Sequence, residues 1–338
     1  MAAESAWYAS RLRAELLVRS RRHARGRLHV ESYGNPPVVV FAPQDGCHGN
    51  FFDPAYSAIA QNPAWMRRFD KVHAQAARSL PKAERRWREL DSSMSSDALL
   101  MNVFCTPGVA ESAPLRSVLG TEAGMEAGAT PEFGWKARVP LGNGRFDRTE
   151  VDMRFGSLLV EAKLTEADFQ TCAPSTVEAY RDFDRIFDRD LLPQVALSLA
   201  RPRRASEFPE NFSQEFESEI GDPETKSAVD EVVPAPTAPG YASYQLIRNV
   251  LAAAAADSSF CVLHDARRPD LREEWFRVMA AVKDAEVRVR LKVLTWQELA
   301  SYLPGELREF LDLKYGIVPP GRIPSPAEIR PDEERSNS

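Results

Sequence analysis

Asp152, Glu161 and Lys163 are the residues whose types and spacing point most directly to chemistry. Asp152 lies in one run of alternating apolar residues, and Glu161 and Lys163 stand two apart in the next run. Residues two apart on a strand point to the same face, so these side chains are expected to converge. Two carboxylates offer the oxygen ligands that suit Mg²⁺, and an amine beside them can hold or polarise a water next to a phosphate. The pattern is typical of a metal-dependent site for phosphodiester cleavage.

Three strands are expected to position this site. The segments 133–141, 149–155 and 157–164 alternate apolar and polar residues in the manner of strands. The glycine-rich segment 142–144 is expected to turn the chain after the first strand, and Gly156 begins a tight turn between the second and the third. The sequence therefore predicts a hairpin that carries the acidic residues on neighbouring strands.

The spacing of Asp152 and then Glu161-x-Lys163 across a hairpin resembles the PD-(D/E)XK nuclease superfamily, which has the restriction-endonuclease-like fold. Val151 stands where the motif has Pro, as is common in divergent members. The order helix, three strands, helix, strand over residues 92–264 also matches the αβββαβ core of that superfamily. The resemblance implies an α/β fold with a mixed central sheet.

The resemblance also implies roles for individual residues. Asp152, Glu161 and the Ala162 carbonyl would hold one or two Mg²⁺ ions, with Mn²⁺ as a possible substitute. Lys163 would place a positive charge opposite the nucleophilic water, and the two carboxylates should keep it protonated. Gln245 resembles the Gln found near the start of the following helix in several branches, which makes it the fourth expected catalytic residue.

Further polar residues are candidates for the same site. Arg248 lies one turn beyond Gln245 and is expected to reach a phosphate oxygen of the substrate, although both residues also suit the polar side of a half-exposed helix. In the resembled fold the helix before the sheet often adds a carboxylate near the metal. Glu89, Asp97 and Glu111 are the nearby acidic residues, and the sequence does not select among them.

The chain divides into a helical N-terminal region at 1–91, a nuclease-like domain at 92–322 and a flexible polar tail at 323–338. Within the domain, 165–240 is predicted to be an insertion, partly disordered because its second half is acidic and Pro-rich. The remaining predicted elements are helices at 6–25, 55–60, 65–79, 81–90, 92–104, 269–283 and 296–303, a helix from Tyr241, and strands at 260–264 and 287–294.

Composition restricts the class of protein. The chain has 338 residues, 43% hydrophobic and 27% charged, as in ordinary soluble globular proteins. It has no apolar run of about 18 residues that could span a bilayer and no signal-peptide pattern at its start, so a cytoplasmic protein without a membrane partner is expected. Its four scattered cysteines form no Cys-x-x-Cys pair, which argues against a zinc ribbon and a disulfide scaffold.

The net charge of −6 counts mildly against a nucleic-acid partner. However, positive charge is concentrated locally in basic clusters at 19–27, 82–88 and 201–204, which could contact phosphate groups. The acidic insertion accounts for part of the negative charge. We therefore expect a nucleic-acid substrate, with DNA favoured by the resemblance. Homodimerisation stays open.

Three hypotheses follow. The best is a metal-dependent DNA endonuclease of restriction, defence or repair type. The alternative is a catalytically inactive nuclease-like scaffold that binds nucleic acid or a protein partner, and the third is an unrelated α/β protein whose Glu-Ala-Lys triplet is a surface accident. A spatial observation separates the third hypothesis from the first two. The first two require the side chains of Asp152, Glu161 and Lys163 to lie within a few ångströms of one another in a cleft, rather than on an open face.

Overall fold

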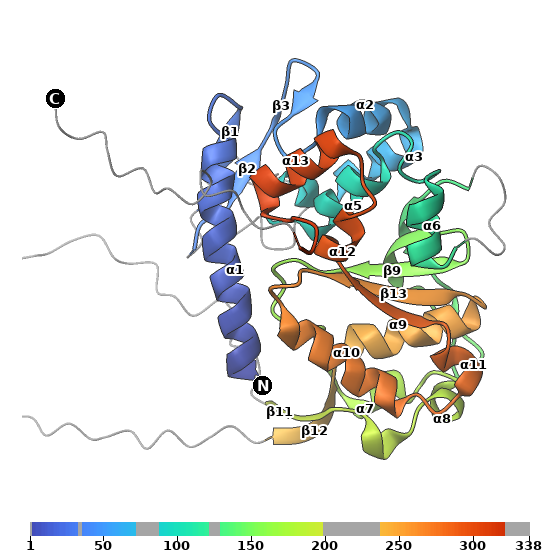
Figure 1. Cartoon of the computed structure of the whole chain (residues 1–338). Helices are drawn as coiled ribbons and strands as arrows, with labels where there is room; N and C mark the ends of the chain where they lie inside the picture. Colours follow the sequence, from blue (N-terminus) through green and yellow to red (C-terminus); the bar gives the residue numbers. More distant parts are fainter. Residues whose placement is uncertain (1, 33–35, 72–87, 122–128, 199–236, 322–338) are drawn as a thin grey trace, which may run out of the picture.

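A mixed five-stranded sheet forms the centre of the molecule (Figure 1). The computed structural model describes residues 2–32, 36–71, 88–121, 129–198 and 237–321. The strands are β5 Glu132–Lys136, β8 Glu150–Phe155, β9 Leu158–Ala162, β13 Ser259–His264 and β14 Leu291–Thr295. Their order is β14-β13-β9-β8-β5, in which β13 is parallel to both of its neighbours and β8 is antiparallel to both of its own.

The β8–β9 hairpin is the local feature that sets the register of the sheet. Gly156 has a φ of 60° in the turn, which glycine adopts without the steric cost that a side chain would bring. Phe155 then pairs with Leu158, and Met153 with Val160. Every residue of β9 is buried, as expected for a central strand covered on both faces.

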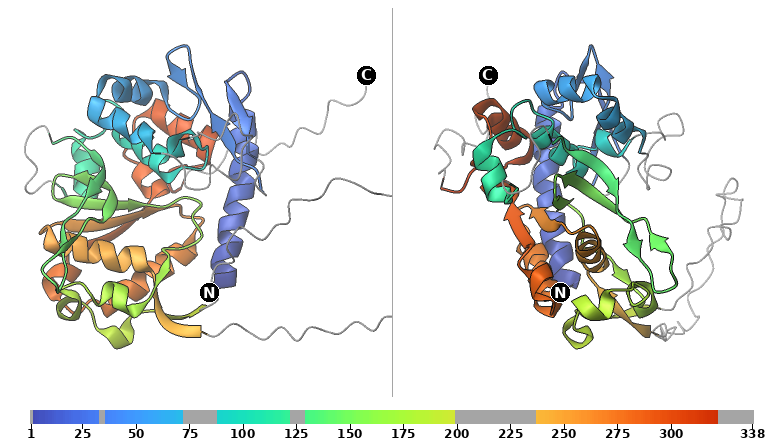
Figure 2. Two further views of the ribbon diagram at one scale, coloured as in Figure 1. Left: turned by 180° about the vertical axis from the view of Figure 1, so that it is seen from behind. Right: turned by 90° about the vertical axis from the view of Figure 1, so that its right-hand side faces the viewer.

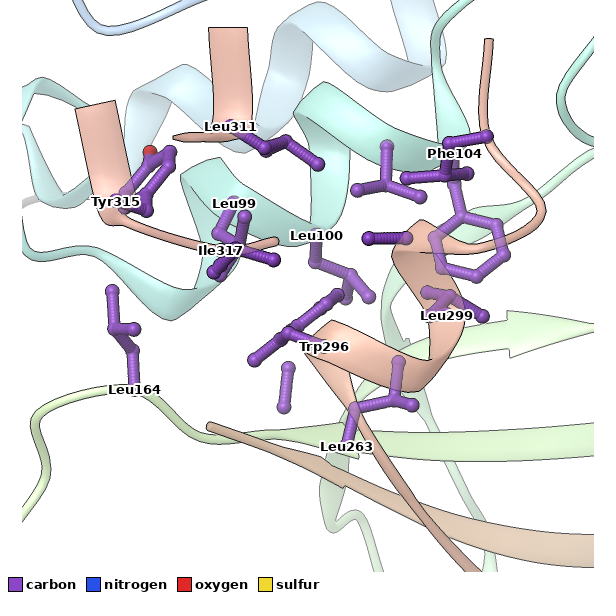
Figure 3. Packing of buried hydrophobic residues seen from close by; sticks show 14 of the residues in the cluster. Leu99, Leu100, Phe104, Leu164, Leu263, Trp296, Leu299, Leu311, Tyr315 and Ile317 are labelled. Carbon is purple, nitrogen blue, oxygen red and sulfur yellow. The ribbon is translucent and has the colours of Figure 1, made fainter. Parts of the chain in front are cut away.

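Helices cover one face of the sheet and build the larger core. They are α5 Ser96–Phe104, α6 Ala113–Leu119, α12 Trp296–Ala300 and α13 Gly305–Tyr315, with α1 Ala2–His23 alongside (Figure 1). All nine residues of α5 are buried, and the Ser95 hydroxyl caps the helix by accepting from the Ala98 N–H. Figure 3 shows Leu100, Trp296 and Leu263 meeting between α5, α12 and β13.

The opposite face is covered by α9 Tyr244–Ala255 and α10 Pro269–Ala281. The views in Figure 2 show these two layers on either side of the sheet. The shorter elements on this side are α7 Pro174–Val177, α8 Phe183–Ile186, η4 Arg189–Leu191 and α11 Ala285–Arg288. A second sheet, of order β10-β12-β11, contains β10 Thr171–Cys172, β11 Gln194–Ser198 and β12 Thr237–Ala242.

The other short elements lie toward the N-terminal part and the sheet edge. They are β1 His29–Glu31, β2 Val39–Phe41, β3 Pro43–Gln44, β4 Cys47–His48, α2 Asp53–Gln61, α3 Pro63–Met66, η1 Arg67–Asp70, η3 Glu89–Asp91, β6 Val139–Pro140 and β7 Phe146–Asp147. Strands β6 and β7 pair as a hairpin that extends the ribbon formed by β5 and β8. Trp65 of α3 donates from Nε1 to the Pro131 carbonyl at 2.8 Å, which ties this region to β5.

The order α5, β5, β8, β9, α9, β13 is the one predicted from the sequence, but several boundaries differ. The expected strand 133–141 is split into β5 and β6, because the ribbon leaves the sheet after Lys136. Lys163 lies one residue beyond β9 rather than within it, although its N–H still donates to the Leu263 carbonyl at 2.7 Å. The hairpin geometry at the motif is therefore preserved.

Two predicted boundaries beyond residue 240 are wrong. The helix expected from Tyr241 starts at Tyr244, because Tyr241 belongs to β12 and Ser243 takes a left-handed φ of 62° between the two elements. The strand expected at 287–294 starts only at Leu291. The Asp284 side chain accepts from the N–H groups of Glu286 and Val287, and this cap starts helix α11 where a strand was expected.

The predicted insertion at 165–240 is regular at both of its ends. Strands β10 and β11 lie within it, and β12 begins at Thr237, inside the segment expected to be an acidic excursion. Backbone pairing of β12 with β10 and β11 satisfies the peptide groups there. Several predicted segments lie outside the described residues, namely 199–236 with the basic cluster at 201–204, and the tail from 322. The same holds for most of the predicted helix at 81–90 and for most of the basic cluster at 82–88.

Within the described ranges, no helix is long and apolar enough to cross a membrane.

Candidate active site

Lys163 is the centre of a buried polar cluster at the end of β9. Its Nζ lies 2.9 Å from Glu161 Oε1 and donates to Gln245 Oε1 at 2.9 Å. Burial alone would lower the pKa of Lys163, but the carboxylates of Glu161, Glu166 and Asp152 outweigh burial and raise that pKa overall. The residue is only 5% exposed, so the raised pKa favours a charged ammonium in the protein interior.

Asp152 faces Glu161 from the neighbouring strand. Its Oδ2 accepts a hydrogen bond from the Ala162 N–H at 2.8 Å, so the side chain spans the gap between β8 and β9. Burial, Glu161 and Asp97 all raise the pKa of Asp152, because each disfavours a further negative charge at this position. Several carboxylates are thus held close enough to repel one another.

Helix α9 supplies two amide side chains to the cluster. Gln245 accepts from Lys163, and Asn249, four residues later, donates from Nδ2 to Glu161 Oε2 at 2.7 Å. Residues four apart lie on one face of a helix, so a single face of α9 contacts both members of the Glu161–Lys163 pair. The first turn of the helix is anchored to the loop after β9, since the Gln245 N–H donates to the Phe169 carbonyl at 2.9 Å.

The larger core fixes the backbone of Lys163. Trp296, a buried residue of α12, donates from Nε1 to the Lys163 carbonyl at 3.0 Å. Figure 3 shows Trp296 surrounded by aliphatic side chains between the sheet and the helices above it. A residue in the apolar core therefore orients the peptide that carries the lysine.

A second ionic cluster adjoins Asp152. Arg68 of η1 donates to Asp97 Oδ2 and to Glu150 Oε1, both at 2.6 Å, and Lys71 lies 3.6 Å from Asp97. Gly134 makes room for this guanidinium, because a Cβ at that position would lie 2.3 Å from Arg68 Nη1. Asp97 is therefore close to Asp152 but already neutralised by two cations.

The remaining predicted residues occupy different positions. Glu89 is bound to Lys71 at 3.0 Å, and burial together with Asp97 raises its pKa. Glu111 is exposed in the loop after α5. Arg248 donates to the Glu150 carbonyl at 3.5 Å, and its guanidinium lies 5.2 Å from the centroid of the Tyr244 ring.

The donor set suits one small divalent cation. Magnesium is usually bound by one or two carboxylates and keeps several waters, and Asp152 with Glu161 provides two carboxylates. Within the described part of the chain, no group of three or more His, Cys, Asp or Glu side chains is arranged to hold a metal. Burial first, and then the negative charges of Glu161 and Asp97, raise the pKa of Asp152, and a cation at this position would offset the repulsion between these carboxylates.

The sequence analysis did not identify Asn249, Arg68 or Glu150 as residues at or beside the site. Asn249 could have been found, because its spacing of four from Gln245 places both on one helix face. Arg68 and Glu150 could not, because Arg68 precedes Glu150 by 82 positions and no local pattern connects them.

A family model described as "Restriction Endonuclease associating with ARP" matches residues 19–316. No curated protein and no solved structure matches the chain.

Proposed function

The chain belongs to the family of restriction endonucleases associating with ARP, and we propose that it is a PD-(D/E)XK-type nuclease that uses Mg²⁺ at Asp152 and Glu161 to cut DNA. The family match supports a nuclease of restriction or defence type. The mixed five-stranded sheet is compatible with a restriction-endonuclease-like fold.

The observation that carries the proposal is the buried, charged Lys163 bonded to Glu161 and Gln245 beside Asp152. Holding the Lys163 ammonium and the Glu161 carboxylate out of water is costly, and structural stability alone gives little reason for it. Phosphodiester hydrolysis needs positive groups at the scissile phosphate, because negative charge builds on the phosphoryl oxygens as the bond breaks. The lysine ammonium is one such group, and the carboxylates would hold a metal cation as another.

Each residue then has a distinct role. Asp152 and Glu161, with the Ala162 carbonyl, would hold the cation, which supplies charge neutralisation and a more acidic bound water. Lys163 stays protonated and places its charge beside the scissile phosphate, acting as an electrostatic positioner rather than as a base. Gln245 orients the lysine ammonium, and Asn249 fixes the second oxygen of Glu161.

The direct test is a nuclease assay with plasmid, linear and single-stranded DNA and with RNA, in Mg²⁺, in Mn²⁺ and in chelator. The wild type should cut DNA only with a divalent ion. Asp152→Ala should lose both cleavage and Mn²⁺ binding measured by calorimetry, whereas Asp190→Ala, which removes an exposed carboxylate, should keep both. An Asp152→Ala protein that cuts as fast as the wild type would falsify the proposed site.

The same calorimetry separates an enzyme from an inactive scaffold. In the structure, Lys163 and Asn249 each bind one oxygen of Glu161, so a cation must compete with both. A wild-type protein that neither binds Mn²⁺ nor cuts any substrate would indicate a nuclease-like scaffold.

A further inference from the structure

A two-stranded ribbon with several cationic side chains runs out from the central sheet beside the candidate active site. We call residues 136–148 the basic arm. It contains β6 and β7 and continues β5 and β8, with the Ala137 N–H donating to the Thr149 carbonyl at 2.8 Å where the regular pairing is interrupted. The right-hand view of Figure 2 shows this green ribbon running out from the sheet.

The two faces of the basic arm differ in character. Ala137 and Val139 are buried in the core that α9 covers, together with Val151 of β8. Lys136 and Arg138, which alternate with the two buried residues of the arm, are exposed, and so are Arg148 on the returning strand and Arg145 just after the tip. The apolar face attaches the arm to the protein, which leaves the basic face available to a partner.

The two acids beside the cations of the basic arm have other partners. Asp147 accepts a hydrogen bond from the Tyr180 hydroxyl at 2.7 Å, and Glu150 is bound by Arg68 and Lys71. Among the described residues, none forms an ion pair with the four arm cations. Four unpaired cations gathered on one short ribbon stand out in a chain whose net charge is −6.

The basic face begins next to the candidate site. Lys136 pairs with Glu150 across the ribbon, and Asp152 follows Glu150 by two residues on the same strand. Arg148 precedes Asp152 by four residues, which corresponds to about 13 Å along an extended strand. Duplex DNA carries one negative charge per about 1.7 Å of its axis, so a length of this order faces several phosphates.

A cavity beside the basic arm and a cation–π pair on the arm also favour a nucleic acid. A cavity of about 470 Å³ between α3, η1 and β5 is lined by Trp65, Arg67 and Lys136 among others. On the arm itself, the Arg138 guanidinium lies 4.5 Å from the ring centroid of Phe146, which is 49% exposed. Guanidinium groups beside aromatic rings suit phosphates and bases better than they suit an acidic peptide.

We propose that the basic arm holds the phosphate backbone of the DNA duplex on one side of the scissile bond. The proposal rests on the proposed nuclease function and adds the path of the substrate across the protein. Contacts of this kind position a duplex and carry little sequence information.

The test compares two charge-removing double variants of the full-length protein. Arg138→Gln/Arg148→Gln removes two charges from the arm, and Arg22→Gln/Arg25→Gln removes two exposed charges from the N-terminal basic cluster. Binding of a short fluorescent DNA duplex of mixed sequence is followed by anisotropy with Ca²⁺ in place of Mg²⁺, over a range of salt concentrations. An RNA duplex of the same sequence serves as the second probe, and urea midpoints verify folding.

The arm variant should bind the DNA duplex about tenfold more weakly, and its plot of log K against log salt should be shallower by about 2, because two phosphate contacts are lost. The N-terminal variant should bind within twofold of the wild type. Equal losses in the two variants, or none in the arm variant, would overturn the proposal. So would RNA binding as tight as DNA binding.

Cleavage distinguishes this proposal from the proposed function. If the wild type never cuts DNA but the arm variant binds it weakly, the nuclease assignment fails and the basic arm stands. If the wild type cuts DNA and the arm variant binds and cuts equally well, the basic arm fails and the nuclease assignment stands.

Discussion

Lys163 and Lys314 are both buried, at 5% and 0% exposure, but their surroundings are opposite in charge. Lys163 lies 2.9 Å from Glu161, and the carboxylates around it raise its pKa. Lys314, on α13, donates to Asn50 Oδ1 and, at 2.7 Å, to the Tyr315 hydroxyl. Burial, helped by the positive charge of Arg27, lowers the pKa of Lys314 well below its usual value.

The difference teaches that burial alone does not decide whether an amine is charged. Desolvation disfavours the ammonium form in both places, and only nearby carboxylates reverse the outcome. Within the described chain no carboxylate forms an ion pair with Lys314, so the amine can be buried neutral as a hydrogen-bond donor. A charge retained at Lys163 is therefore a feature of its site, which strengthens the case for a chemical role there.

The largest expected difference between the two lysines is in cleavage. Lys163→Met should lower the rate of DNA cleavage by about 10²–10³-fold, because a preorganised positive group next to the phosphate is lost. Lys314→Met should cut at the wild-type rate per folded molecule. Rates are compared at saturating Mg²⁺ on plasmid DNA, and equal losses in the two variants would remove the distinction.

The second difference concerns stability. Lys163→Met leaves the buried Glu161 without its cation and should cost about 3 kcal/mol in the free energy of unfolding. Adding Glu161→Gln to that variant removes the stranded charge and should restore part of the loss. Urea denaturation of the single and double variants measures both effects. A double variant less stable than Lys163→Met would contradict the ion-pair interpretation.

The third difference is the dependence of stability on pH. A lysine in an unfolded chain has a pKa of about 10.4. Below that pH, Lys314 is protonated in the unfolded state, whereas its lowered pKa favours the neutral amine in the folded state. Stability from this group is complete above the unfolded pKa and falls as the pH drops toward the lowered folded pKa, by up to about 1.4 kcal/mol per pH unit. The raised pKa of Lys163 places its own effect above pH 10.4 instead.

Urea midpoints between pH 8 and pH 10 isolate that slope. The difference in stability between the wild type and Lys314→Met should increase with pH, because other titrating groups are common to both proteins. The corresponding difference for Lys163→Met should stay constant over the same range. A flat difference for Lys314→Met would mean that its amine is charged in the folded state.

The same contrast explains how much could be predicted from the sequence. The grouping of Asp152, Glu161 and Lys163 could be predicted because a tight hairpin relates the first two, and residues two apart share a strand face. Gln245 was located through the order of elements. These are short-range or topological rules that a single sequence displays.

The other contacts depend on distant parts of the chain. Arg68 reaches Asp97 and Glu150 only after the N-terminal region has packed against the sheet. Lys314 meets Asn50 across 264 positions, and no periodicity in either segment indicates that its amine will lack a carboxylate. The charge state of a buried lysine is a property of the assembled fold, so the sequence alone could not distinguish Lys314 from an ordinary helix-surface lysine.

The smallest effect expected is that of Lys314→Met on stability at neutral pH. The substitution removes the donor for Asn50 Oδ1 and the Tyr315 hydroxyl, and a buried polar group without a partner costs about 1–3 kcal/mol. It also removes the cost of burying an amine that must lose its proton, which acts in the opposite direction. The net loss should therefore be about 1 kcal/mol, less than for Lys163→Met, and it should increase at pH 10, where deprotonation costs almost nothing. Thermal or urea unfolding at the two pH values measures both terms. A loss at neutral pH as large as that of Lys163→Met would mean that Lys314 also holds a charge that its surroundings stabilise.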